Sequence, residues 1–365
     1  MKTWKVGIVG LSRGRGFVRV FGAHPRIEVT ALCDVDAARL AEVGEAFGLP
    51  EVRRHADFDD FLGAEMDIVM VATPIPLHAE QTVGSLESGR HVLCEQTAAY
   101  TVEECARIVE AVRRTGRAYM MAENYCYFHY VREWQRMIGA GRLGDIYYAE
   151  AEYVHEIIPL LVNDETGAYF WRHARPPIWY CAHCLGPLLT LMDDRIVQAC
   201  GSVTRAGVEA PGFSRRPDQS DHPGFLDMEL GLFRTQRGAL IKILRSQVAH
   251  RYPHLVWYSL YGTKGYVESG RDMKDGLLFL QGEQSPKEGA RAVPCPVSDP
   301  DAPEEARAGG HGTSEYFMIR DFLDALDQKK RPPIDVVRAM DFTVPGLIAH
   351  ASAMSDGNWR DVPLF

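Results

Sequence analysis

The chain has 365 residues, of which 46% are hydrophobic and 24% charged, and these values are typical of a globular protein with two domains. Its net charge of −9 gives no attraction for nucleic acid or an anionic membrane, and no apolar run approaches the roughly 20 residues that span a bilayer. We therefore expect neither as a partner. The N-terminus runs directly into a predicted strand without an apolar signal core, so we expect a cytoplasmic protein.

The first predicted strand, residues 5–9, ends in a glycine-rich turn. Residues 10–16 read Gly-Leu-Ser-Arg-Gly-Arg-Gly and lead into a helical pattern. Glycines in such a turn let the backbone approach a pyrophosphate, which then lies at the helix N-terminus. Ser12 stands where a second glycine is usual, so an ordinary surface loop is the alternative. Gly10, Ser12 and Arg13 are the candidate cofactor residues of this turn.

The second predicted strand, residues 27–33, is followed by Asp34. An acid at this distance from the glycine turn accepts the ribose hydroxyls of a dinucleotide and repels a 2′-phosphate. The next residue is Val35, so we expect no cation beside Asp34, and NAD is favoured over NADP. Arg13 and Arg15 argue in the other direction, because an arginine in the loop can bind a phosphate.

Three more buried strands are predicted at residues 66–72, 91–94 and 118–122, with helices between them. Each strand is followed by polar residues, and ligands bind beyond the carboxyl ends of the strands in open α/β sheets. Ordinary loop polarity explains any one of these residues, but the set indicates a binding site. The candidates at these strand ends are Thr73, Pro74, His78, Glu95, Gln96 and Asn124.

From about residue 142 the chain is rich in strands, predicted at 145–155, 225–233, 238–244, 255–261 and 265–268, with a long loop at 283–310. The alternation in 145–155 places Tyr153 and His155 on one face of their strand. A helix is predicted to start near Tyr180, with His183 on the same face of its first turn. A packed aromatic pair is the alternative for the first two residues, and a solvated helix end is the alternative for the histidine.

The motifs of the first half resemble those of the glucose–fructose oxidoreductase, inositol dehydrogenase and MocA (Gfo/Idh/MocA) family. They are Ala-Thr-Pro-x-x-x-His at 72–78 and Gly-Arg-His-Val-Leu-Cys-Glu at 89–95, and the resemblance covers nearly the whole chain. It implies an α/β fold with an N-terminal doubly wound Rossmann domain, residues 1–123. A C-terminal α+β domain with a large, open, mostly antiparallel sheet would comprise residues 124–365. Its final helix would pack either within this domain or back on the first domain. It also implies a homodimer or homotetramer that associates through this sheet.

Two departures separate the chain from the dehydrogenases of that family. These carry Glu-Lys-Pro where this chain has Glu95, Gln96 and Thr97, and glutamine cannot carry a proton. The Asp-x-x-x-His pair of the second domain is also missing. The motifs at 149–156, 171–172, 180–187 and 310–312 are instead similar to the NAD-dependent glycosidases, such as α-N-acetylgalactosaminidases and sulfoquinovosidases.

This second resemblance implies roles for residues of the second half. Tyr153, His155, Tyr180 and His183 would be the acid–base residues, without fixed individual roles, and Trp171 and Arg172 would lie near the nicotinamide. The substrate-binding candidates are Tyr127, His173, Arg175 and His311. A tyrosine base needs a nearby cation, for which His183, His155 or NAD⁺ are the candidates. The cations at 172, 173 and 175 would suit an anionic group on the sugar, and a salt-bridged loop is the alternative.

The expected function is glycoside hydrolysis by transient oxidation at sugar carbon 3, elimination, water addition and re-reduction. The substrate would be a small glycoside or sugar. An ordinary NAD-dependent sugar or polyol dehydrogenase is the second hypothesis, and a silent NAD-binding protein is the third. Cys181 and Cys184 form a lone C-x-x-C without the second pair that a zinc site would need, so we expect packing and no metal.

Overall fold

The computed structural model describes residues 2–163, 165–204, 226–272 and 274–365. The chain forms two compact units. Unit 1 comprises residues 1–129, 297–340 and Phe365, and unit 2 comprises residues 130–296 and 341–364. The division therefore differs from the single boundary expected after residue 123, because the chain returns to unit 1 at residue 297.

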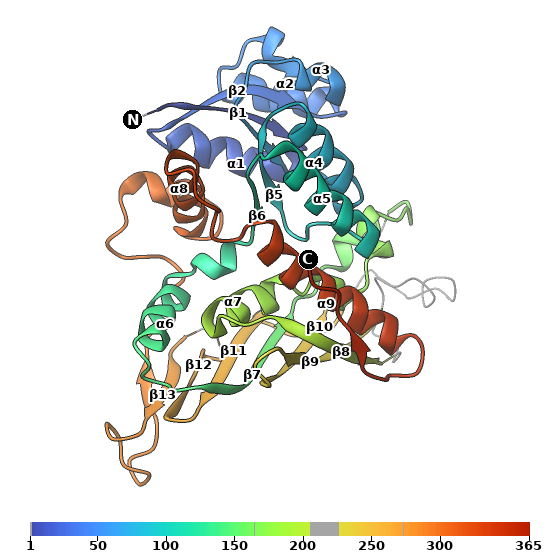
Figure 1. The fold of residues 1–365 in the computed structure, drawn as a ribbon. Coiled ribbons are helices and arrows are strands. Elements are labelled where there is room, and N and C mark those ends of the chain that lie inside the picture. The colour runs from blue at the N-terminus through green and yellow to red at the C-terminus, as the bar shows by residue number, and fades with distance from the viewer. Residues whose placement is uncertain (1, 164, 205–225, 273) are drawn as a thin grey trace. The chain divides into compact units, whose positions relative to one another are not determined.

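The described part of unit 1 is built on a six-stranded parallel sheet with the strand order β3-β2-β1-β4-β5-β6 (Figure 1). The order reverses between β1 and β4, which is the doubly wound topology expected from the sequence. The apolar run around residue 70 becomes β4, all four residues of which are buried. The strands are β1 Trp4–Val9, β2 Ile27–Cys33, β3 Arg54–His55, β4 Ile68–Val71, β5 His91–Glu95 and β6 Tyr119–Ala122.

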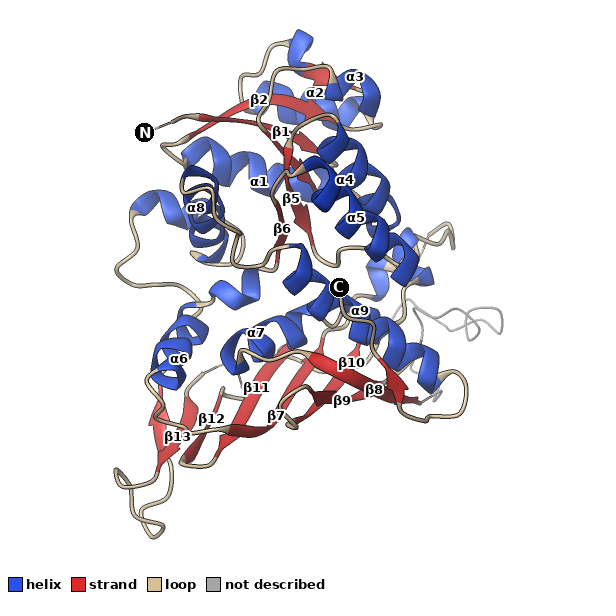
Figure 2. Cartoon of the chain, viewed as in Figure 1, coloured by secondary structure: helices blue, strands red, loops and turns tan. Residues whose placement is uncertain are grey.

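Helices connect these strands and cover both faces of the sheet, with α4 and α5 on one face and α1 on the other (Figure 2). The strongest local signals belong to α5, where Thr101 and Glu104 form a capping box and Gly116 ends the helix with a φ of 63°. The helices are α1 Leu11–Ala23, α2 Ala37–Ala46, α3 Phe58–Leu62, α4 His78–Glu87 and α5 Val102–Thr115, and a short 3₁₀ helix, η3 Asn124–Tyr127, follows β6.

The returning segment of unit 1 contains the 3₁₀ helix η9 Glu304–Ala308 and the helix α8 Ser314–Asp327. Polar contacts attach α8 to the first strands of the sheet. Arg26 binds Asp324 and Asp327 at 2.5 and 2.7 Å, and Trp4 Nε1 donates to Asp327 Oδ1 at 3.2 Å. These contacts join residues about 300 positions apart, so local sequence patterns do not reveal them.

The described part of unit 2 contains a nine-stranded sheet in the order β14-β13-β12-β11-β7-β10-β9-β8-β15. Every neighbouring pair whose register is given is antiparallel except β7 and β10, so the expected mostly antiparallel sheet is confirmed. The strands are β7 Ile146–Val154, β8 Ile196–Val203, β9 Glu229–Thr235, β10 Leu240–Ser246, β11 Leu255–Gly262, β12 Gly265–Glu268, β13 Gly276–Leu280, β14 Arg291–Val293 and β15 Arg360–Asp361.

Two details differ from the expected elements. The long loop predicted at 283–310 contains η9 and the short strand β14, which pairs with β13. A strand of three residues is too short for a periodic signal, and only its partner stabilises it. The strand predicted from residue 225 begins at Glu229, and residue 225 itself lies outside the described residues.

The helix α7 Ala182–Met192 packs on β7 and β11 of this sheet, and ten of its eleven residues are buried. Helix α9 Val336–Ala353 begins in unit 1 and contributes most of its length to unit 2. A Cβ atom at Gly201 of β8 would lie 2.4 Å from the carbonyl oxygen of Ala349, so α9 lies directly on that strand. The remaining described helices of unit 2 are α6 His129–Gly139, which starts at the unit boundary, and the 3₁₀ helices η4 Ile158–Leu160, η5 Trp171–Ala174 and η6 Pro177–Tyr180.

Candidate active site

The glycine-rich turn between β1 and α1 has the backbone geometry that a dinucleotide needs. Gly10 has a φ of 88°, and a Cβ atom there would lie 2.5 Å from the backbone nitrogen of Thr73, so glycine is required. The N-cap residue of α1 is Gly10, which has no side chain to cap the first turn, where Ser12 and Arg13 lie. Backbone N–H groups at a helix N-terminus bind a phosphate. The turn therefore fits the pyrophosphate of NAD.

Asp34, directly after β2, holds this turn in place. Its buried carboxylate accepts hydrogen bonds from Leu11 N–H at 2.6 Å and from Asp36 N–H at 2.9 Å. A carboxylate has further lone pairs for the ribose hydroxyls. The expectation that no cation lies beside Asp34 is wrong, because Arg39 Nη1 lies 3.4 Å from Asp34 Oδ1. The first turn of α2 brings Arg39 back to the strand end, which the sequence neighbour Val35 does not indicate.

His78 braces two loops of the cofactor edge. Its Nδ1 lies 2.8 Å from the carbonyl oxygen of Thr97, and its Nε2 lies 2.8 Å from that of Thr73. Burial disfavours the imidazolium, but the sulfur of Cys94 and the two carbonyls outweigh it and raise the pKa of His78 to about 9. Both ring nitrogens therefore donate to the backbone at neutral pH. This geometry gives His78 a bracing role between the two loops, and its contact with a cofactor stays a prediction.

The other predicted residues of this edge lie beyond the strand ends as expected. Pro74 precedes a short 3₁₀ turn after β4, and Thr73 Oγ1 donates to Gln81 Oε1 at 2.6 Å. Gln96 follows β5 and is 3% exposed, and Asn124 follows β6 and is 4% exposed. Among the described residues, no hydrogen-bond partner is found for Asn124 Nδ2. A buried amide N–H₂ of this kind is a suitable donor to a bound ligand.

Arg13 connects the glycine turn to two carboxylates. Its Nε lies 2.6 Å from Glu95 Oε1, and its Nη2 lies 3.5 Å from Glu315 Oε1. Glu315 also accepts from His311, with Nδ1 at 2.8 Å and the backbone N–H at 3.1 Å. Burial opposes ionisation of Glu315, but His311 and Arg13 lower its pKa below the usual value. The sequence analysis missed Glu315. The available signal was its spacing, because it follows His311 by four residues at the start of a helix.

The predicted substrate residues Tyr127 and His311 both belong to unit 1. Tyr127 lies in η3 and is 5% exposed, and His311 lies between η9 and α8. They were expected in the second domain because the returning segment was not recognised. Their position places them in the same unit as the cofactor residues.

Unit 2 brings the four predicted acid–base residues together. Tyr153 lies on β7, His155 just after it, Tyr180 at the end of η6 and His183 in the first turn of α7. The ring of His183 lies 5.1 Å from that of Tyr180 and 5.5 Å from that of Tyr153, and Tyr153 stacks on His155 at 5.6 Å. Tyr180 is in the 3₁₀ turn instead of the helix predicted there, but the predicted proximity to His183 holds. The four side chains form one cluster, which we call the Tyr/His cluster.

A buried arginine, Arg245, completes the Tyr/His cluster. It lies on β10 in register with Tyr153, and it is 1% exposed. Its guanidinium carbon lies 4.2 Å from the ring centre of Tyr153 and 5.4 Å from that of Tyr180. Arg245 also donates to the carbonyl oxygens of Tyr153 at 2.8 Å and Pro177 at 3.1 Å. The sequence analysis missed Arg245, although an arginine at an inward position of an apolar strand was a usable signal.

His155 is neutral in this environment. Its ring centre lies 3.9 Å from that of His254. Burial lowers the pKa of His155 to about 4, and the charges of His254 and Arg245 act in the same direction, against a smaller opposing effect of Glu156. The expectation that His155 could supply positive charge to a tyrosine is therefore wrong, and Arg245 is the cation in that place.

Arg175, another buried arginine, lies close to Tyr180. It is 2% exposed, its guanidinium carbon lies 4.0 Å from the Tyr180 ring centre, and its Nη2 donates to Gln247 Oε1 at 2.7 Å. Gln247 Nε2 in turn donates to the backbone oxygen of Arg175 at 2.9 Å. A cation thus lies beside each of the two tyrosines.

The residues of η5 are less enclosed than the Tyr/His cluster. Arg172 lies with its guanidinium carbon 4.4 Å from the Trp171 ring centre, and His173 stacks on Tyr169 at 4.8 Å. His173 Nδ1 also lies 2.7 Å from the carbonyl oxygen of Phe170. Trp171 and Arg172 belong to unit 2, and their position near the nicotinamide stays a prediction.

Close packing around α7 fixes Tyr180 and His183. The hydroxyl of Tyr258 donates to the backbone oxygen of His183, and a Cβ atom at Gly346 of α9 would lie 2.5 Å from the backbone oxygen of Ile178. Cys181 and Cys184 are buried thiols, and burial raises the pKa of Cys181 above its ordinary value. The described residues contain no group of three or more His, Cys, Asp or Glu side chains that could hold a metal.

Sequence comparison finds a match for the N-terminal part of unit 1. Residues 4–123 match the family model described as the Gfo/Idh/MocA oxidoreductase family with an NAD-binding Rossmann fold. A glycosyl hydrolase family 109 protein from Streptomyces niveus is 26% identical over 100% of this chain and 77% of its own length. Another, from Streptomyces filamentosus, is 27% identical with the same coverage.

Structural comparison extends the likeness to the whole fold. An oxidoreductase domain protein from Kribbella flavida matches with a TM-score of 0.83 and 19% identity over 100% of both chains. A levoglucosan dehydrogenase in complex with NADH and levoglucosan matches with a TM-score of 0.82 and 19% identity over 99% of both. Within the described residues, no helix combines the length and the apolar character that crossing a membrane requires.

Proposed function

We propose that this chain, whose residues 4–123 match the NAD-binding Rossmann domain of the Gfo/Idh/MocA family, hydrolyses glycosides by transient oxidation of the sugar with NAD. The observation that carries the proposal is the Tyr/His cluster around Arg245 in unit 2. Oxidation of one hydroxyl needs one base, whereas this cluster holds several groups that can move protons. The likeness to family 109 glycosyl hydrolases supports the same activity.

The cofactor fits the residues present in unit 1. The pyrophosphate would lie at the start of α1 beside Gly10, and the adenosine ribose at Asp34. NAD supplies a hydride acceptor for carbon 3 of the sugar and returns the hydride at the end of the cycle. Asn124, which has a buried amide nitrogen, is the proposed donor to the nicotinamide or the sugar.

The chain's own residues move the protons. One tyrosine, stabilised as an anion by Arg245 or Arg175, takes the proton from the hydroxyl at carbon 3. The resulting ketone acidifies carbon 2, from which a second base removes a proton while the bond from carbon 1 to the aglycone breaks. A protonated member of the cluster donates to the leaving oxygen. Water then adds at carbon 1, carbon 2 regains a proton, and the hydroxyl at carbon 3 is restored.

His155 is the proposed second base. Its pKa of about 4 keeps it neutral and able to accept a proton near pH 7, although its low basicity means that the acidified carbon 2 must provide most of the driving force. His183 contacts both tyrosines and is the proposed relay between them. The substrate is a small glycoside, and the cations at 172 and 175 favour one with an anionic group.

The alternative activity is net dehydrogenation of a sugar or polyol, which the fold of the levoglucosan dehydrogenase makes relevant. Gln96 argues against it, because its amide cannot relay the proton that a lysine carries at this position of the dehydrogenases. Absorbance at 340 nm distinguishes the two: a dehydrogenase accumulates NADH from free sugar, whereas the proposed hydrolase releases aglycone without net NADH.

The decisive experiment is cleavage of aryl glycosides in heavy water. The proposal requires the carbon-2 proton to leave, so the product sugar should carry deuterium at carbon 2, measured by NMR. Removal of NAD should abolish cleavage and its return should restore it. Tyr153→Phe and His183→Ala should each lower the rate by roughly 10²–10⁴-fold, the usual contribution of a positioned acid or base. Full retention of protium at carbon 2 by an active enzyme would refute the mechanism.

A further inference from the structure

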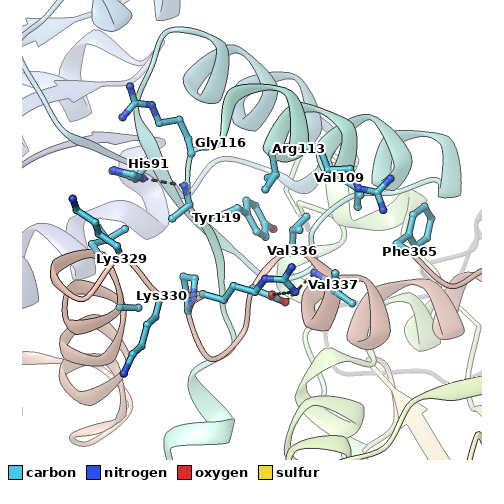
Figure 3. A pocket seen from close by; sticks show the side chains of 18 of the residues that line it. His91, Val109, Arg113, Gly116, Tyr119, Lys329, Lys330, Val336, Val337 and Phe365 are labelled. Carbon is cyan, nitrogen blue, oxygen red and sulfur yellow. Dashed lines mark hydrogen bonds and ion pairs between the residues drawn. The ribbon is translucent and has the colours of Figure 1, made fainter.

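Unit 1 has a second concave region at the edge of the sheet opposite to the cofactor residues. It is a groove of about 920 Å³ that includes Trp4, His91 and Tyr119 (Figure 3). These residues lie at the first positions of β1, β5 and β6, whereas the cofactor residues follow the last positions of the strands. The groove is therefore separate from the candidate active site.

The groove has apolar walls and charged ends. Figure 3 shows Val109 and Arg113 of α5 on one side, Val336 on the other, and Tyr119 between them. Lys329 and Lys330, on the loop after α8, lie at the end of the groove farther from Val109 (Figure 3). A volume in this range, with mostly apolar walls and a few convergent polar groups, is typical of sites for small organic molecules.

Positive charge dominates the groove although the whole chain carries −9. Its lining has one acidic side chain, Asp335, which lies 3.9 Å from Arg331. The other cations of the lining make no ion pair with any of the described residues, and they are Arg113, Arg117, Lys329 and Lys330. Burial lowers the pKa of His91 to about 4, and the charges of Arg117 and Lys2 act in the same direction.

We propose that the groove binds a small organic phosphate, in addition to the NAD held at the opposite edge. Arginine pairs with phosphate through two parallel N–H groups and lysine through a compact charge, and the rim provides both kinds. The apolar walls would hold the organic part of the ligand. An uncharged sugar would leave the cations without a partner, and an inorganic ion alone would leave the walls uncovered.

The test uses the full chain saturated with NAD, so that the adenosine site is occupied. AMP and glucose 6-phosphate are titrated by calorimetry at physiological ionic strength, beside adenosine, glucose and inorganic phosphate. At least one organic phosphate should bind about tenfold or more tightly than its uncharged counterpart and than inorganic phosphate. The Arg113→Glu/Lys330→Glu variant should lose this binding with unchanged NAD affinity and melting temperature.

Lys287→Glu is the matched control, because Lys287 is exposed in unit 2 and makes no ion pair with the described residues. It should bind the phosphate as the unchanged protein does. The proposal is overturned if neither organic phosphate exceeds its uncharged counterpart, or if binding survives reversal of the groove charges. The second result would place the phosphate at another site.

Discussion

Arg245→Met tests whether the buried guanidinium stabilises a tyrosine anion in the proposed reaction. The guanidinium carbon lies 4.2 Å from the ring centre of Tyr153. Two unit charges about 4 Å apart attract each other by about 4 kcal/mol at an effective dielectric constant of about 20, and by about 1 kcal/mol in water. The first value is an upper limit here, because the charge of the anion is centred on the phenolate oxygen and not on the ring centre. Since about 1.4 kcal/mol corresponds to a factor of ten, kcat should fall between roughly 5-fold and 10³-fold. Methionine approximates the length of the side chain, so the packing volume is largely kept.

The same substitution removes donors from the carbonyl oxygens of Tyr153 and Pro177, so some loss of stability is also expected. Activity must therefore be separated from folding. Kinetics on an aryl glycoside are measured below the melting temperature of each variant, as a function of pH. Loss of the cation should move the activity profile toward higher pH, which a merely structural role would not do.

Two controls make the result interpretable. Arg245→Lys keeps the charge and should retain more activity than Arg245→Met at a similar stability. Arg195→Met removes an arginine that binds Asp341 at 2.8 Å in the same unit, and it should lower stability without shifting the pH profile. A folded, NAD-loaded Arg245→Met enzyme with unchanged kcat and pH profile would refute the electrostatic argument.

Three further predictions concern the cofactor, the reaction and acid stability. Asp34→Asn keeps a hydrogen-bond acceptor but removes the charge, and Arg39 lies nearby, so the affinity for NADP should rise toward that for NAD. The affinities for NAD and NADP are measured by fluorescence titration, and equal values in the unchanged protein would contradict this prediction. Gln96→Lys should lower glycoside cleavage without creating steady NADH production; a large gain of sugar oxidation would favour the dehydrogenase hypothesis. The pKa of His155 is about 4 when folded and about 6.5 when unfolded, so between these values the unfolded chain binds the extra proton and stability falls as pH decreases. The melting temperature of His155→Gln should therefore fall less than that of the unchanged protein as the pH decreases over that range. An equal fall in both proteins would show that His155 does not contribute.

Local sequence patterns predicted those features of the fold and the site whose physical cause lies in residues close together along the chain. Gly10 is required because the backbone at that position needs a positive φ close to Thr73, and the continuous apolar run of β4 is buried on both faces. The alternation that placed Tyr153 beside His155 and the three-residue spacing of Tyr180 and His183 also reflect local geometry. These features gave the Rossmann domain, its cofactor edge and the members of the Tyr/His cluster.

Tertiary structure decided what depends on residues distant along the chain. Arg245 reaches Tyr153 only because β10 pairs with β7, and no spacing along the sequence encodes that partnership. His78 is a brace because two carbonyls meet its ring, and His311 belongs to unit 1 because the chain returns there. Burial, which depends on the whole packed unit, makes His155 neutral. The sequence by itself therefore determined which residues are available for the chemistry, while the fold determined their charges and their neighbours.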